Sequence, residues 1–137
     1  MTTIWPWVVT GEALAPFSRP ARKRTGDTAP PPHLTDETDQ ADGGLVLAMY
    51  ADWTTAAMRE KNAPPQTVTE TNYNISYWTP AQMVAHHASN GCNLEPGYLF
   101  GSGTVSGPTD EARATIAELS ERGSTPLNID GEEQLWL

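Results

Sequence analysis

The sequence predicts a β-rich α+β fold with one short helix near residues 80–89. Twelve prolines and eleven glycines among 137 residues make long helices improbable and imply many turns. Three short segments, residues 3–9, 45–50 and 72–77, show the alternation of side chains that is typical of strands. The length is that of one modest domain and leaves little room for a second independent core.

The three predicted strands differ in the environment that their sequences favour. Residues 3–9 contain Pro6, which has no amide hydrogen to donate and therefore favours a sheet edge or a bulge. Residues 45–50 follow a glycine pair and are apolar at nearly every position, as in a strand buried on both faces. Residues 72–77 alternate polar and apolar side chains, which predicts an extended segment with one solvated face.

The helix has start and stop signals at both ends. Thr79 is a good N-cap, and Pro80 suits the first helical position. Asn90-Gly91 predicts the end of the helix. Small apolar residues recur at helical spacing and predict a narrow face for close packing: Ala81, Val84, Ala85 and Ala88.

Two stretches are harder to interpret. Residues 16–44 hold five prolines and a polar acidic run, which predicts a long surface loop or a disordered insert. Residues 109–122 resemble a capped helix locally, because Thr109-Asp110-Glu111 precedes an alanine-containing segment that ends at Gly123.

Charge and composition exclude several classes of partner. The net charge of −9 argues against nucleic acid or an anionic membrane surface as the main partner. Four of the eight basic residues cluster in six positions, and in this acidic chain a solvated loop is favoured over an anion-binding patch there: Arg19, Arg22, Lys23 and Arg24. No apolar run reaches the length of about 18 residues that a membrane span needs, and the first residues do not read as a secretory signal.

Histidine and cysteine give no sign of a metal centre. His86 and His87 are adjacent, so on a helix they point about 100° apart and favour structural roles over joint metal ligation. Cys92, the single cysteine, excludes an internal disulfide and a cysteine-rich zinc site. We expect it to be a buried, inert thiol in a protein of the reducing cytoplasm.

The residues from Tyr77 to Leu94, Tyr-Trp-Thr-Pro-Ala-Gln-Met-Val-Ala-His-His-Ala-Ser-Asn-Gly-Cys-Asn-Leu, form a long and unusual run. Together with Gly101-Ser-Gly-Thr-Val-Ser-Gly-Pro108, this run closely resembles the fumarylacetoacetase (fumarylacetoacetate hydrolase) family. The start of the chain and its end, from Asp130-Gly131-Glu132 to Leu137, are similar to the same family. The resemblance is collinear over nearly the whole chain and weakest at 18–44.

The resemblance implies a metal-dependent hydrolase of the tyrosine and phenylalanine degradation pathway. Such enzymes cleave a carbon–carbon bond of a 1,3-diketone with water, which converts fumarylacetoacetate to fumarate and acetoacetate. A divalent ion, Mg²⁺ or Ca²⁺, holds the diketone oxygens and stabilises the leaving enolate. A histidine base activates the water, while a glutamate, a lysine and an arginine position and stabilise charge. The family fold is a mixed β-roll, and the complete enzyme is typically a homodimer.

Three residues of this chain correspond to family site positions. The resemblance implies that Thr104 binds substrate, that Glu118 is the glutamate of the catalytic network, and that Thr2 lies at the edge of the metal site. In the family the segment containing the glutamate is extended, whereas the local sequence at 109–122 favours a helix.

The family's catalytic histidine, metal ligands, arginine and lysine have no counterparts here. We therefore expect residues 1–137 to be a partial C-terminal catalytic domain, an incomplete form of the β-roll, and to be inactive and bind no metal on its own. The alternative is a catalytically inactive fragment that serves as a binding or scaffolding remnant. In either case exposed strand edges predict low stability, with aggregation or dimerisation.

Overall fold

The computed structural model describes residues 3–24 and 29–134. Within these residues the chain forms two compact units. The first unit is built from the residues up to Val46 together with Tyr77–Leu94, and the second from Leu47–Ser76 together with the residues from Glu95 onward. Each unit is therefore assembled from two separate stretches of chain.

The first unit contains short helices and one small sheet. Strands β1 and β2 pair antiparallel, with Ser18 opposite Leu45. The elements in chain order are α1 (Gly11–Leu14), the 3-10 turn η1 (Ala15–Phe17), β1 (Ser18–Arg19), the 3-10 turn η2 (Pro32–Leu34), α2 (Glu37–Asp42), β2 (Gly44–Leu45) and α4 (Pro80–Ser89).

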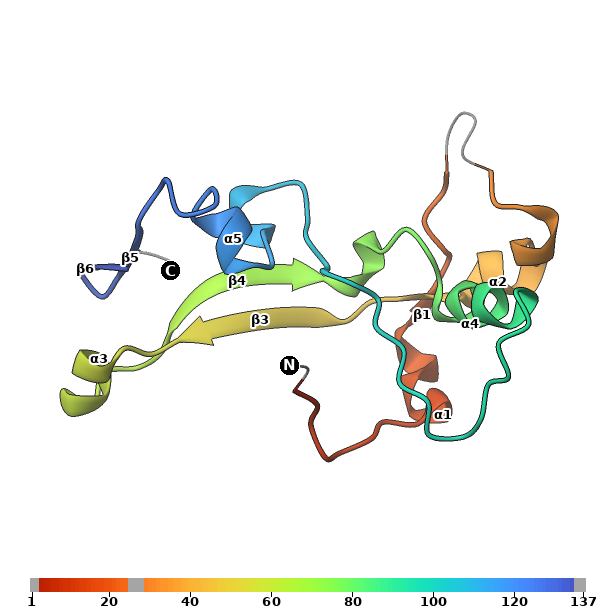
Figure 1. The fold of residues 1–137 in the computed structure, drawn as a ribbon, viewed down its shortest axis with the longest axis horizontal. Helices are drawn as coiled ribbons and strands as arrows, with labels where there is room; N and C mark the ends of the chain where they lie inside the picture. The colour runs from red at the N-terminus through yellow and green to blue at the C-terminus, as the bar shows by residue number, and fades with distance from the viewer. Residues whose placement is uncertain (1–2, 25–28, 135–137) are drawn as a thin grey trace. The chain divides into compact units, whose positions relative to one another are not determined.

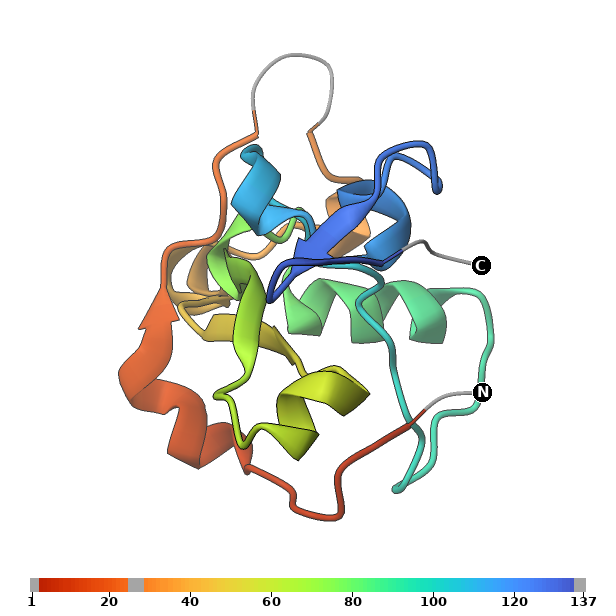
Figure 2. The ribbon, with the colours of Figure 1, turned by 90° about the vertical axis from the view of Figure 1, so that its left-hand side faces the viewer.

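Helix α4, the longest helix of the described residues and drawn in green in Figure 2, has the predicted boundaries. Its predicted packing face is wrong, because Ala81, Val84 and Ala88 are exposed and the buried residue of the helix is Gln82. The Thr79 hydroxyl accepts a hydrogen bond from the Gln82 amide at 3.1 Å, and the Gln82 side chain accepts one from the Thr79 amide at 3.2 Å. This reciprocal pair is a capping box, which satisfies two amides at the helix start. Gly91 follows with a φ of 86°, a left-handed conformation that glycine adopts at low cost, and ends the helix.

Gln82 is the centre of a buried polar cluster in the first unit. Only 3% of the residue is exposed. Its amide nitrogen donates to the Leu34 carbonyl at 2.8 Å, which ties α4 to η2. The Thr79 hydroxyl donates to the Asp39 carboxylate at 2.8 Å, which ties the start of α4 to α2.

The predicted loop at 16–44 contains regular structure. Asp36 caps α2, because its carboxylate accepts from the Asp39 amide at 2.8 Å. This Asp-capped start is a recognised helix signal, but α2 lacks the apolar periodicity that usually reveals a helix. Residues 25–28 lie outside the described part of the chain.

Residues 3–9 form no strand, so the prediction of an edge strand there is wrong. Their large side chains are exposed, with Trp5 at 75%, Trp7 at 77% and Val8 at 87%. An alternating pattern becomes a strand only when a second strand satisfies its amides and carbonyls. No such partner lies beside this segment among the described residues.

The second unit is dominated by an antiparallel hairpin. Strand β3 (Ala48–Trp53) pairs with β4 (Gln66–Asn72), and α3 (Ala56–Glu60) lies in the connection between them (Figure 1). The register shifts between Ala51 and Asp52, which leaves Val68 as the extra residue of a bulge. Buried Thr69 donates from its hydroxyl to the Arg113 carbonyl at 2.8 Å and so anchors the later chain on β4.

Two predicted strand positions need correction. The predicted strand at 45–50 is divided between β2 and β3, and Tyr50 is 61% exposed rather than buried. The predicted segment 72–77 is a 3-10 turn, η3 (Tyr73–Ile75), because the Asn72 side chain accepts from the Asn74 amide at 3.0 Å and closes the turn. The strand itself, β4, precedes this segment and is rich in threonine.

The C-terminal part of the second unit contains two short helical turns and a small hairpin. These are η4 (Asp110–Ala112), α5 (Ile116–Leu119), β5 (Leu127–Ile129) and β6 (Glu132–Gln134). The β5–β6 turn holds Asp130 at a φ of 51° and Gly131 at 80°, as in a two-residue hairpin loop with two left-handed residues. The segment 109–122 is therefore neither one helix nor extended throughout.

These elements confirm an α+β fold, although several short helices replace the single helix that was predicted. The fumarylacetoacetase-type β-roll stays a prediction. Four apolar residues of the described chain are buried: Leu34, Met58, Ala112 and Ile129.

Candidate active site

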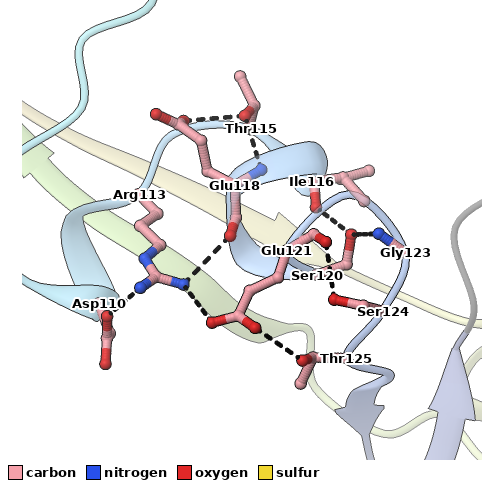
Figure 3. Close-up of polar contacts among 10 residues, drawn as sticks. All are labelled: Asp110, Arg113, Thr115, Ile116, Glu118, Ser120, Glu121, Gly123, Ser124 and Thr125. Atoms are coloured by element: carbon pink, nitrogen blue, oxygen red, sulfur yellow. Dashed lines mark hydrogen bonds and ion pairs between the residues drawn. The ribbon is translucent and has the colours of Figure 1, made fainter.

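Glu118, the predicted catalytic residue, lies on the exposed surface of α5. Thr115 caps this helix, since its side-chain oxygen accepts from the Glu118 amide at 3.1 Å. The same hydroxyl donates to Glu118 Oε2 at 2.8 Å (Figure 3). Thr115 therefore fixes both the backbone and the carboxylate of Glu118.

A second hydroxyl reaches the same carboxylate oxygen from a distant part of the sequence. Ser106 Oγ donates to Glu118 Oε2 at 2.7 Å, a length typical of a hydroxyl that donates to an ionised carboxylate. The hydrogen bonds from Ser106 and then Thr115 hold the pKa of Glu118 below its ordinary value. The carboxylate of Glu118 therefore stays ionised to a lower pH than that of an ordinary glutamate.

Arg113 lies beside α5 but pairs with other acids. Its guanidinium contacts Asp110 at 2.6 Å and Glu121 at 3.8 Å. It donates to the main-chain carbonyl of Glu118 at 3.2 Å. In Figure 3 the Glu118 side chain points toward Thr115 and away from this guanidinium. The Glu118 carboxylate is thus held by neutral hydroxyl groups, with Arg113 supporting the backbone of the turn.

Thr104, the predicted substrate-binding residue, is exposed in the segment that leads to Ser106. Gly103, just before it, has a φ of 75°, which a residue with a side chain rarely adopts. Thr104 and Glu118 belong to the same unit, and the hydrogen bond of Ser106 connects their segments. Their roles in binding and catalysis stay predictions. Thr2, the predicted edge of the metal site, lies outside the described residues.

Sequence reasoning missed Ser106. Ser106 lies in the glycine-rich run Gly103-Thr104-Val105-Ser106-Gly107. The run as a whole resembles the family, and this resemblance was the one signal that pointed to the segment. Its contact with Glu118 spans twelve residues, and no local pattern predicts it.

Metal-ligating side chains do not gather in the part of the chain that the structure describes. No group of three or more histidine, cysteine, aspartate or glutamate residues there could hold an ion. His86 and His87 are exposed on α4. Cys92 is exposed as well, so its predicted burial is wrong: the left-handed Gly91 turns the chain at the surface after α4.

Arg24, in the basic run at 19–24, makes specific contacts that the sequence analysis did not predict. The Arg24 guanidinium lies 4.6 Å from the ring centre of Tyr77 and 4.1 Å from that of Trp78. It donates to the Tyr77 carbonyl at 3.0 Å and to the Gln82 side chain at 2.6 Å. Arg24 is therefore a structural anchor of the first unit rather than a purely solvated charge.

Comparison of the sequence with known protein families shows the family to which the chain belongs. Residues 1–130 match the family model described as fumarylacetoacetate (FAA) hydrolase, C-terminal. This match covers Thr104, Ser106 and Glu118, and the chain belongs to the fumarylacetoacetate hydrolase family.

Particular relatives extend the comparison beyond the family. The chain is 38% identical to proteins named fumarylacetoacetase from Arabidopsis thaliana, over 137 residues, and from Homo sapiens, over 138 residues. A protein of the same name from Caenorhabditis elegans is also 38% identical, over 137 residues. Each alignment covers 99% of this chain but 30% of the relative. The chain thus spans about 30% of the length of these relatives.

No described helix has the length and apolar character needed to cross a membrane.

Proposed function

We propose that this chain forms part of the active site of a fumarylacetoacetase-type hydrolase. The reaction would be the cleavage of fumarylacetoacetate by water to fumarate and acetoacetate, in tyrosine and phenylalanine degradation. The observation that carries the proposal is the family match over residues 1–130, together with relatives named fumarylacetoacetase at 38% identity. The assignment of residues 1–137 as a partial C-terminal catalytic domain belongs to the same proposal.

Two described residues would act on the substrate or its immediate surroundings. The exposed Thr104 hydroxyl can donate a hydrogen bond to an oxygen of the diketo acid. The Glu118 carboxylate, ionised and held by two hydroxyls, can accept a further hydrogen bond or stabilise positive charge on a neighbouring group. Hydrolysis also needs a base that activates water, which the proposal assigns to a histidine in the rest of the enzyme.

The described residues do not fit a divalent ion by themselves, since no cluster of suitable ligands is present among them. We therefore assign the ligands of Mg²⁺ or Ca²⁺ to the remainder of the complete enzyme. Thr2 is proposed to lie at the edge of that site. The part played by the described residues is confined to binding the diketo acid and positioning charge.

The second candidate is an inactive chain that binds another protein. The observation that favours it is the exposed apolar segment near the start of the described residues, where Trp5 and Trp7 are each at least 75% exposed. Large exposed apolar side chains in sequence are typical of a surface that contacts another chain. A binding remnant would retain this contact without catalysing hydrolysis.

Co-expression distinguishes the two candidates. The chain is produced alone and together with the N-terminal part of the human relative that precedes the matched region, and the complex is purified. Hydrolysis is followed as loss of fumarylacetoacetate and formation of fumarate. We expect turnover by the complex and none by the isolated chain. A stable complex of the two parts that does not hydrolyse fumarylacetoacetate would overturn the hydrolase and support the binding remnant.

The variant Thr104→Ala tests the binding role within that complex. Loss of one hydrogen bond to substrate costs about 0.5–1.5 kcal/mol, or roughly a 2- to 13-fold rise in KM. Thr38→Ala, at an exposed threonine of α2, is the matched control and should leave KM unchanged. An unchanged KM in Thr104→Ala would remove Thr104 from the proposed site.

A further inference from the structure

Ser106 makes two hydrogen bonds, one as an acceptor and one as a donor. Its oxygen accepts from the Ala114 amide at 3.2 Å, while its single hydrogen is donated to Glu118 Oε2 at 2.7 Å. A serine hydroxyl has one hydrogen to donate, and here it is directed to the carboxylate. Since Ala114 donates to the same oxygen, the orientation of the hydroxyl is restricted from both sides.

The backbone next to Ser106 is anchored independently of its side chain. The Gly107 amide donates to the Ala112 carbonyl at 2.8 Å. A Cβ placed on Gly107 would approach the Ala112 methyl to 2.6 Å, so the two segments touch as closely as a glycine permits. We therefore expect the segment to keep its place when the hydroxyl alone is removed.

The two hydroxyls on Glu118 differ in what they connect. Thr115 is three residues from Glu118 and belongs to the same helical turn. Ser106 is twelve residues away and lies two residues after Thr104. Ser106 is thus the side chain that joins the Thr104 segment to the carboxylate of Glu118.

We propose that Ser106 is a positioning residue for the Glu118 carboxylate and sets its orientation relative to the segment that carries Thr104. The inference rests on the proposed function for its catalytic meaning, because Glu118 acts in the reaction only if the chain is part of the hydrolase. The geometric part concerns the 137-residue chain itself. It requires that the Ser106 hydroxyl stabilise the ionised form of Glu118.

The charged groups around α5 do not supply this stabilisation directly. Arg113 forms its ion pairs with Asp110 and Glu121, and its contact with Glu118 is to the main-chain carbonyl. Asp110 and Glu121 are themselves acids, which would disfavour a further negative charge nearby. The hydroxyls of Ser106 and Thr115 are therefore the main groups that favour the ionised carboxylate, and backbone amides of the same turn add to their effect.

The first test is a carboxyl NMR titration of Glu118 in the 137-residue chain, labelled with ¹³C at glutamate. We expect Ser106→Ala to shift the Glu118 pKa upward, and Ser106→Thr, which keeps a hydroxyl, to restore it. Ser102→Ala is the matched control, because Ser102 donates to the Gly103 carbonyl instead of to a carboxylate. Exchange protection of the Gly107 amide reports whether the backbone contact survives in each variant. An unchanged Glu118 pKa in Ser106→Ala, with Gly107 still protected, would overturn the proposal.

The second test uses the co-expressed complex. Loss of the positioning hydroxyl should lower kcat while leaving KM close to that of the parent, and should move the acid limb of the kcat profile to higher pH. A merely structural role would lower the amount of folded complex without moving that limb. Failure of the complex to turn over refutes the proposed function, whereas the NMR titration still decides the placement of Ser106.

Discussion

The buried side chain of Gln82 gives the sharpest test of how the first unit is held together. Replacing it by leucine, which is similar in size, leaves the Leu34 carbonyl and the Thr79 amide without their partners. Both residues are buried, at 6% and 4% exposure. A buried polar group left unpaired costs about 1–3 kcal/mol, so two of them predict a loss of about 2–6 kcal/mol.

A graded variant separates the two contacts. Gln82→Glu keeps an acceptor for the Thr79 amide and for Arg24 but loses the donor to the Leu34 carbonyl. One unpaired group predicts a loss of about 1–3 kcal/mol, which the charged contact with Arg24 partly offsets. Val84→Ala, on the exposed side of the same helix, should change stability by less than about 0.5 kcal/mol.

Hydrogen–deuterium exchange measured by mass spectrometry suits this prediction, because it gives the opening free energy of α4 separately from that of other segments. Peptides covering α4 and η2 should exchange fastest in Gln82→Leu, then in Gln82→Glu, and as in the parent in Val84→Ala. Equal exchange in Gln82→Leu and Val84→Ala would refute the assignment of Gln82 as the centre of the cluster.

Three further predictions concern the rest of the chain. Replacing exposed Trp5 and Trp7 by serine removes apolar surface and should reduce the self-association of the isolated chain, measured by sedimentation velocity; an unchanged distribution would contradict this role. Gly131→Ala forces a side chain into a left-handed turn and should destabilise the β5–β6 hairpin by roughly 1–2 kcal/mol in exchange experiments, whereas Asp130→Asn should be neutral. Because the folded-state pKa of Glu118 is lowered, its hydroxyl contacts stabilise α5 above the ordinary glutamate pKa, and this stabilisation is lost as pH falls through the lowered value. The opening equilibrium of the Glu118 amide, obtained from its exchange after correction for the intrinsic rate at each pH, should increase over that acid range, and a pH-independent opening would count against the contact.

The helix α4 could be predicted from sequence because its signals are local. Thr79, Pro80 and Gln82 satisfy the helix start among themselves, and Gly91 ends it through its own backbone. Residues 3–9 show the opposite case. Their alternation indicates which faces could be buried, but a strand also needs a hydrogen-bonding neighbour, which no local pattern supplies.

The strand β4 illustrates a different limit. Its residues Gln66–Asn72 are mostly polar, so hydrophobic alternation gave no sign of a strand. The strand forms because β3 pairs with it and because the Thr69 hydroxyl has a partner in the Arg113 carbonyl. These contacts arise from tertiary structure and lie beyond the reach of pattern analysis.

The candidate site contains residues that the sequence indicated and one residue that it did not. Thr104 and Glu118 are candidates through the family resemblance of their surrounding residues, and their roles stay predictions. The local sequence correctly indicated helix-forming character around Glu118, although the result is the four-residue α5 rather than one long helix. Ser106 was missed because its contact with Glu118 joins two segments whose approach depends on the backbone contact between Gly107 and Ala112.

The division of each unit between two stretches of chain affects the order in which the protein can fold during synthesis. Leu34 and Asp39 emerge from the ribosome well before Thr79 and Gln82, which complete their contacts. The first unit therefore stays unfinished until translation has passed through all of Leu47–Ser76, a segment that belongs to the second unit. During that interval the Leu34 carbonyl and the Asp39 carboxylate lack the partners that Gln82 and Thr79 later supply, so the early part of the first unit cannot complete its contacts as it is made.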